Sequence, residues 1–62
     1  MTPQELRAWQ ARMGYTQQQA SDALGISRAT YNRYLVHGAG KMVALACAAV
    51  EAGLREAYKK LA

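Results

Sequence analysis

Apolar residues recur in this chain at spacings of three and four positions, which places them on one face of an α-helix. Leu6, Trp9 and Met13 form the first such stripe. Thr2 can cap the start of a helix ahead of this stripe, and Gly14 can end the helix behind it. The pattern therefore predicts a first helix between these two residues, with its apolar face turned inward.

Capping residues divide the next segment, residues 16–36, into two short helices. Thr16 can cap the first of them, and Gln19 three residues later can complete a capping box. Gly25 suits the left-handed residue that ends a helix, and Ser27 can cap the helix that follows. Two caps about eleven residues apart leave room for a short turn, which is the spacing of a helix-turn-helix.

The second of these helices, expected over residues 28–36, has two different faces. At about 100° per residue, an arc of roughly 140° carries the outer side chains and the opposite side is apolar and aromatic. The outer residues are Arg28, Ala29, Asn32, Arg33 and Val36, and the inner ones are Tyr31, Tyr34 and Leu35. Arginine suits guanine edges, asparagine suits adenine, and an alanine methyl can touch the thymine methyl. This helix alone is compatible both with DNA reading and with an ordinary amphipathic surface helix.

The run KMVALACAAVEA, from Lys41 to about Ala52, is apolar on nearly every side. More than one face must therefore be covered. We expect one face to pack on the helix-turn-helix and the other to need a partner. A narrow apolar stripe continues beyond it, and the dimer-interface candidates on that stripe are Val50, Leu54, Tyr58 and Leu61. We favour a symmetric homodimer over a fifth helix that caps the core, while residues 54–62 could either form that helix or continue the fourth.

The charge of the chain indicates what class of molecule it binds. The chain has 62 residues and a formal net charge of +4, which favours polyanions. No acid lies between Asp22 and Glu51, whereas Arg28, Arg33 and Lys41 all do. We expect one small helix-turn-helix domain over residues 1–62, with residues 41–62 also serving as a dimerisation segment.

Several function classes lack the residues they need. One histidine, one cysteine and four scattered acids offer no catalytic constellation and no metal site, so we expect neither an enzyme nor a cofactor. Cys47 lies in an apolar run and is interpreted as a small buried hydrophobe. The first ten residues are not those of a signal peptide, and the longest apolar run is too short to cross a bilayer. We expect a cytoplasmic, nucleoid-associated protein.

The segment TQQQASDALGISRATYNRY resembles the helix-turn-helix of the lambda-repressor-like superfamily, the phage Cro and Xre-type regulators. The residues at matching positions are Thr16, Gln17, Leu24, Gly25, Ile26, Ser27, Tyr31 and Tyr34, and Ser21 is small where the family's two helices cross. The resemblance extends over about residues 4–52.

Two departures from the family pattern concern the core. Gln10 and Leu35 stand where family members often carry an arginine and a glutamate that form an ion pair. Ala20 is smaller than the usual leucine, and the candidates for filling the space beneath it are the large aromatic residues Trp9, Tyr15 and Tyr31.

The resemblance implies an all-α fold, a small four- to five-helix DNA-binding domain with a central helix-turn-helix. It also implies a sequence-specific regulator of double-stranded DNA, expected here to be a phage- or prophage-type repressor that occludes a promoter as a homodimer, without a small-molecule effector. We expect Arg28, Ala29 and Asn32 to read base edges. The residues expected to hold or orient the DNA backbone are Gln17, Gln18, Ser27, Thr30, Arg33 and Lys41. The alternative is a protein-interaction module, such as an antitoxin-like protein, that uses the surface of residues 41–62.

Overall fold

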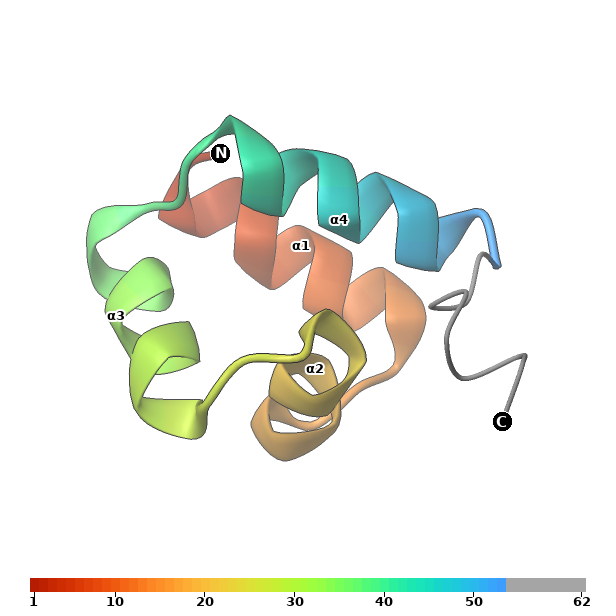
Figure 1. Ribbon diagram of the computed structural model, residues 1–62, viewed down its shortest axis with the longest axis horizontal. Helices are drawn as coiled ribbons and strands as arrows, with labels where there is room; N and C mark the ends of the chain where they lie inside the picture. The colour runs from red at the N-terminus through yellow and green to blue at the C-terminus, as the bar shows by residue number, and fades with distance from the viewer. Residues whose placement is uncertain (54–62) are drawn as a thin grey trace.

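Four helices follow one another in the part of the chain that the computed structural model describes, residues 1–53 (Figure 1). They are α1 (Pro3–Met13), α2 (Gln17–Leu24), α3 (Arg28–His37) and α4 (Lys41–Glu51). These residues contain no strand, which confirms the predicted all-α fold. The predicted helix ends are correct to within one residue: α3 extends to His37 and α4 ends at Glu51.

The helix ends form where local side-chain chemistry satisfies the unpaired backbone groups. The Thr16 hydroxyl accepts the backbone N–H of Gln19 at 3.1 Å, and the Gln19 side chain accepts the N–H of Thr16 at 2.9 Å. Thr2 and Glu5 form the same capping box at the start of α1. Gly25 ends α2 with a φ of 71°, a conformation that costs a residue with a side chain more than it costs glycine. The local sequence therefore determines the turn between α2 and α3.

The core lies between the four helices, and Trp9 and Tyr31 are its two largest fully buried side chains. The other core residues are Leu6, Ala20, Leu35 and Cys47. The indole of Trp9 packs edge-on against Tyr15, with 5.8 Å between the ring centroids, and its Nε1 donates to the backbone oxygen of Cys47 at 3.1 Å. Ala20 belongs to the same buried cluster as Trp9 and Tyr31, and Tyr15 packs against that cluster.

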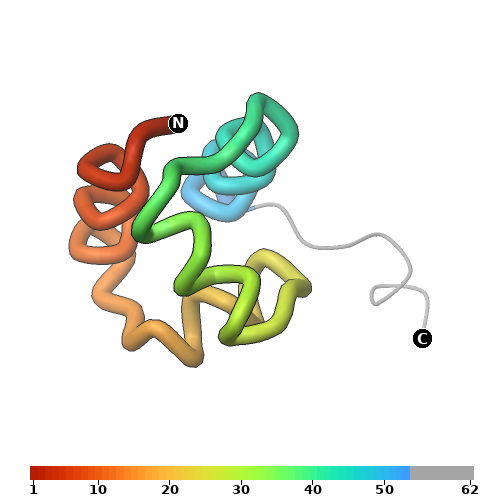
Figure 2. Tube along the Cα trace, turned by 90° about the vertical axis from the view of Figure 1, so that its left-hand side faces the viewer, coloured from red at the N-terminus to blue at the C-terminus, as the bar shows by residue number. Residues whose placement is uncertain are grey.

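The start of the chain holds the connection between α3 and α4 in place. The backbone nitrogen of Met1 donates to the oxygen of Ala39 at 2.8 Å, and the N–H of Ala39 donates to the oxygen of Met1 at 2.9 Å. A Cβ atom on Gly38 would lie 3.0 Å from the Met1 oxygen, and φ at Gly38 is 88°, so this position requires glycine. Figure 2 shows the start of the chain beside this connection. The two hydrogen bonds between Met1 and Ala39 thus hold the segment that leads into α4.

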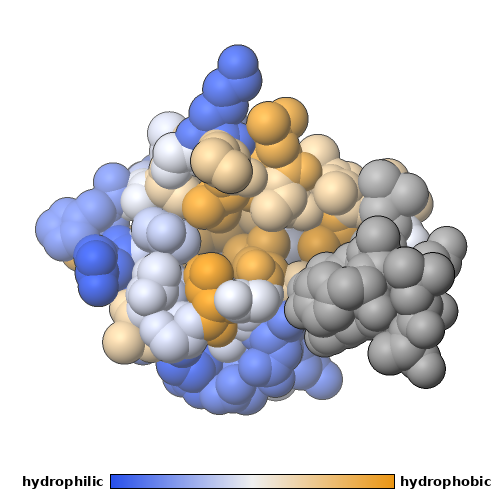
Figure 3. All heavy atoms as spheres, in the orientation of Figure 1, coloured by the Kyte–Doolittle hydropathy of each residue, from blue (hydrophilic) through white to orange (hydrophobic). Residues whose placement is uncertain are grey.

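The outer face of α4 is apolar and uncovered within residues 1–53. Met42 is 84% exposed and Leu45 is 60% exposed. Figure 3 shows apolar side chains gathered along α4, whereas hydrophilic side chains surround α2 and α3. The inner face of α4 packs on the other helices, and the Arg12 guanidinium on α1 pairs with the Glu51 carboxylate at 3.0 Å. No helix among the described residues is long and apolar enough to cross a membrane.

Of the predicted interface stripe, only Val50 lies in the described part of the chain, where it is partly buried and packs against the core. Leu54, Tyr58 and Leu61 lie outside the described residues, as does the question of a fifth helix.

Candidate nucleic-acid interface

Helix α3 lies at the surface with one face buried and the other open. Figure 2 shows it in front of the other helices. Its inner residues Tyr31 and Leu35 are buried, and Tyr34 is half-buried. The five outer residues are all exposed: Arg28, Ala29, Asn32, Arg33 and Val36. The two faces predicted from the helical period therefore separate as expected, and the open face carries two guanidinium groups, an amide and no acid.

Two side chains of α1 hold the inner side of α3. The Tyr31 hydroxyl donates to Oε1 of Gln10 at 2.8 Å, and Nε2 of Gln10 donates to the backbone oxygen of Tyr15 at 3.2 Å. Burial raises the pKa of the Tyr31 phenol, so the hydroxyl stays protonated and can donate at neutral pH. Arg7 donates to the backbone oxygen of Leu35 at 3.2 Å. Hydrogen bonds to Gln10 and to the backbone of Leu35 thus join α1 to the inner side of α3.

The first residue of α3 contacts the first turn of α2 across the turn. Nη2 of Arg28 donates to Oε1 of Gln17 at 3.2 Å, and Nη1 donates to Oε1 of Gln18 at 3.4 Å. Nε2 of Gln18 in turn donates to Oδ1 of Asp22 at 3.0 Å. The structure therefore brings together three of the residues predicted to bind DNA, Gln17, Gln18 and Arg28. It also places an acid next to them.

Ser27 and Thr30 form the cap of α3 and bond to each other. The Ser27 hydroxyl accepts the backbone N–H of Thr30 at 3.1 Å and donates to Oγ1 of Thr30 at 3.0 Å. A phosphate oxygen accepts hydrogen bonds, so it needs a donor. Either hydroxyl can donate in this pair, so one O–H of the two stays available for a phosphate oxygen.

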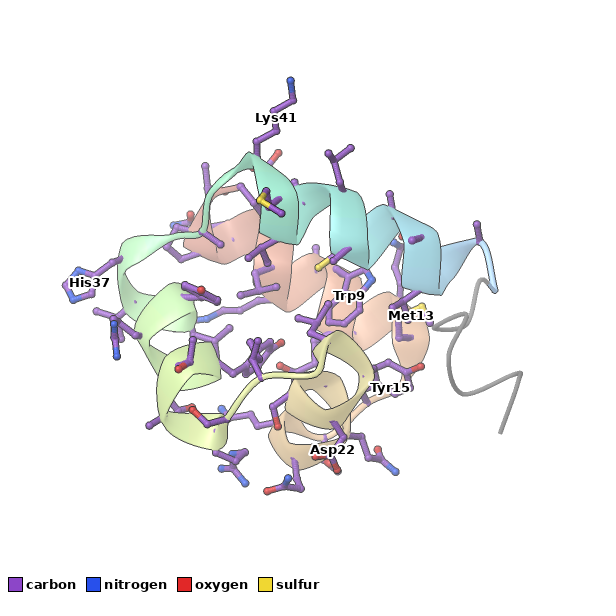
Figure 4. The ribbon with its side chains drawn as sticks, in the orientation of Figure 1. Trp9, Met13, Tyr15, Asp22, His37 and Lys41 are labelled. Carbon is purple, nitrogen blue, oxygen red and sulfur yellow. The ribbon has the colours of Figure 1, made fainter. Side chains whose placement is uncertain are left out.

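Lys41 stands apart from the residues around Arg28. It is exposed at the first position of α4, and Figure 4 shows its side chain pointing away from the body of the molecule, with His37 pointing outward at the end of α3. Its ammonium group and the backbone N–H groups at the start of α4 form a second positive region. The predicted site residues thus fall into three places: the α2–α3 junction, the outer face of α3 and the start of α4.

The comparison with known protein families agrees with this geometry. The model of a family described as helix-turn-helix matches residues 4–36, which covers α1 except its first residue, all of α2, and α3 except its last residue. The chain belongs to the helix-turn-helix family of the lambda-repressor, or Xre, type. This is a family of DNA-binding transcriptional regulators rather than of enzymes. No curated protein matches the chain significantly, and neither does any solved structure.

Three residues of this helix-turn-helix protein contribute to the site without having been predicted to do so. Asp22 bonds to Gln18, Gln10 bonds to Tyr31, and Arg7 bonds to the backbone oxygen of Leu35 near the end of α3. The pair of Gln18 and Asp22 has the four-residue spacing that brings side chains together on a helix, so the sequence did contain a signal for it. The contacts of Gln10 and Arg7 join α1 to α3, which are separated in the sequence by α2, so no local spacing indicates them.

Proposed function

We propose that this chain is a sequence-specific transcriptional repressor that binds a pseudo-palindromic operator as a homodimer and occludes a promoter, in the manner of phage or prophage repressors. The observation that carries this proposal is the open face of α3, where all five outer residues are exposed and none is acidic. Duplex DNA carries a dense negative charge, which an acid on this face would repel. In this proposal occupancy of the operator is itself the regulatory act, and the protein works in the cytoplasm without a small-molecule effector.

In this proposal α3 enters the major groove and its outer residues divide the work. Arg28, Ala29 and Asn32 read base edges. The residues that bind the DNA backbone in this proposal are Ser27, Thr30, Arg33 and Lys41. Gln17 and Gln18 also hold or orient the DNA backbone in this proposal. Their side-chain oxygens accept hydrogen bonds from Arg28.

The homodimer part of the proposal is supported by the outer face of α4. An isologous interface must be complementary to itself, and an uncharged apolar surface meets this condition, whereas a surface of one charge does not. Met42 and Leu45 provide such a surface within the proposed dimerisation segment, residues 41–62. The other residues proposed for the interface are Val50, Leu54, Tyr58 and Leu61. Two α3 helices would then read half-sites about 34 Å apart.

The test is a titration of the full chain against the DNA upstream of its gene, with a scrambled duplex of equal length and composition beside it. We expect tight binding to the upstream DNA alone, weakened steeply by salt with a log–log slope near −0.9 per phosphate neutralised. Equal affinity for both duplexes would refute a sequence-specific regulator.

Substitutions assign the roles within the site. Arg28→Ala should cost about 1–3 kcal/mol on the selected duplex and relax the base preference. Lys41→Ala should weaken all duplexes alike, and Gln4→Ala, a change at an exposed position of α1, serves as the matched control. If Arg28→Ala left the base preference untouched, the assignment of the base-reading residues would be wrong.

The dimer has its own measurement. Sedimentation of the wild type over a concentration series should show dimerisation, and Leu45→Glu and Leu54→Glu should weaken it by placing charges in the interface. A wild type that stays monomeric at high concentration, both free and on the operator, would exclude the homodimer.

The exposed Met42 and Leu45 also support a second function, an antitoxin-like module that binds a partner protein through residues 41–62. This alternative predicts that Leu45→Glu abolishes the interaction with that partner, while Arg28→Ala has no effect. The operator titration separates the two, since an interaction module has no preference between the two duplexes.

A further inference from the structure

A chain of hydrogen bonds links an acid to the arginine at the head of α3. The carboxylate of Asp22 accepts Nε2 of Gln18 at 3.0 Å, and the side-chain oxygen of Gln18 accepts Nη1 of Arg28 at 3.4 Å. Gln17 contributes a second oxygen to the same guanidinium group, at 3.2 Å from Nη2. All four side chains are exposed, so no packing in the core holds them in these positions. Their orientation follows from the hydrogen bonds themselves.

The direction of each bond follows from the chemistry of the groups. An ionised carboxylate only accepts hydrogen bonds, so Asp22 must face the NH2 end of the Gln18 amide. The oxygen end then faces away from Asp22, toward Arg28, which only donates. If the Gln18 amide were turned around, its NH2 group would face the guanidinium, and two donors would oppose each other. Asp22 therefore selects the amide orientation that binds Arg28.

Holding Arg28 before DNA arrives has a consequence for recognition. A flexible arginine loses rotamer freedom when it binds, and this loss reduces affinity. Two of its five N–H donors point to glutamine oxygens, which leaves one N–H on each terminal nitrogen and the Nε–H for the two acceptors of a guanine edge.

We propose that Asp22 and Gln18 are positioning residues that set the guanine preference of Arg28. This inference rests on the proposed function, because it needs Arg28 to read a base. Asp22 acts through its hydrogen bond to Gln18 and does not touch the DNA.

The rival role for Asp22 is that of a negative charge near the phosphates. In that role, removal of the charge strengthens binding to every duplex and leaves the base preference unchanged. Asp22→Ala and Asp22→Asn both remove the charge, but only asparagine keeps an oxygen that can accept Nε2 of Gln18. The two variants therefore separate positioning from charge.

The experiment begins with selection of duplexes from a random pool by the full-length wild type and by Arg28→Ala. The base pair whose guanine preference disappears in Arg28→Ala is the contact of Arg28. At that base pair, the ratio of dissociation constants for A·T and G·C duplexes is then measured for the wild type, Asp22→Ala, Asp22→Asn, Gln18→Ala and the control Gln4→Ala. Circular dichroism checks that each variant is folded.

For the wild type we expect a ratio of about 5- to 150-fold, the discrimination of a good bidentate contact. Asp22→Ala and Gln18→Ala should lower this ratio by about threefold or more, while Asp22→Asn and Gln4→Ala should keep it. Discrimination at base pairs that do not depend on Arg28 should not change in any of these variants.

Each other outcome overturns the inference in a recognisable way. A ratio that stays at the wild-type value in Asp22→Ala or Gln18→Ala refutes positioning. An equal fall in Asp22→Ala and Asp22→Asn shows that the acceptor oxygen of residue 22 is not what sets the ratio. A selected sequence that is the same for wild type and Arg28→Ala removes Arg28 as the reader. In these three cases the specific regulator survives, whereas a wild type that selects no sequence refutes the proposed function as well.

Discussion

Removal of one hydroxyl group tests how α3 is held. In Tyr31→Phe, the hydrogen bond from the Tyr31 hydroxyl to Oε1 of Gln10, 2.8 Å long, is lost while the buried ring remains. A hydrogen bond of this kind contributes about 0.5–1.5 kcal/mol net. Gln10 is only half-buried, so water can satisfy its freed oxygen, and no full desolvation penalty is added. We therefore expect the free energy of unfolding to fall by about 1 kcal/mol.

Such a change is easily measured in a chain of this size. A domain of 62 residues has a total stability of roughly 3–9 kcal/mol, and 1 kcal/mol shifts its Tm by about 4–8 °C. Urea unfolding followed by far-UV circular dichroism gives the free energy, and the m-value should stay unchanged. Tyr34→Phe on the same helix is the matched control, because residues 1–53 provide no hydrogen-bond partner for the Tyr34 hydroxyl.

The bond itself is isolated by a double-mutant cycle with Gln10→Ala. Gln10→Ala alone also loses the bond from Nε2 to the Tyr15 oxygen, so it should cost more than Tyr31→Phe. The coupling between the two changes should be about 0.5–1.5 kcal/mol. A coupling near zero, or a Tyr31→Phe variant as stable as wild type, would show that this bond does not hold α3.

Three further experiments probe other parts of the fold. The bonds from the backbone and hydroxyl of Thr2 lower the pKa of Glu5, so their stabilisation is present above the unfolded-state pKa and is lost as the pH falls through the lowered folded-state pKa. Urea titrations at pH 7 and pH 3 should therefore differ less for Glu5→Gln than for the wild type. Burial raises the pKa of the Cys47 thiol, so Ellman's reagent at pH 8 should label it slowly in the folded chain and rapidly in urea, and fast labelling without urea would place the thiol at the surface. Trp9→Ala should cost about 3–5 kcal/mol, most of the total stability, and give a circular dichroism spectrum with a large unfolded fraction at 25 °C.

The sequence was sufficient for the features that depend on near neighbours. A capping box involves residues three positions apart, so Thr16 and Gln19 could be assigned without knowing the fold. The helical period likewise separates the exposed Arg28 and Asn32 from the buried Tyr31, since it requires only that one face of the helix be covered. The family resemblance then added the arrangement of the helices, which no local pattern contains.

Contacts between distant residues were beyond this reasoning. The Trp9 indole finds the Cys47 oxygen, and Arg12 finds Glu51, only because α1 and α4 lie side by side. No acid lies between Asp22 and Glu51 in the sequence, but Asp22 itself bonds to Gln18, which contacts Arg28. Charge along the chain is a one-dimensional property, whereas the field at a site depends on which helices cross there.

The bonds to α3 differ in what they control. Asn32 and Ala29 have short side chains, so their reach into a groove depends on the position of the helix backbone, which the Tyr31 hydroxyl fixes from the inside. Arg28 has a long side chain whose position depends less on the backbone and more on the glutamine oxygens of α2. Loosening the inner bond should therefore reduce adenine and thymine discrimination before guanine discrimination, and loosening the α2 contacts should do the reverse. Guanine discrimination and adenine and thymine discrimination are thus separable on this helix, because different contacts position the side chains proposed to carry them.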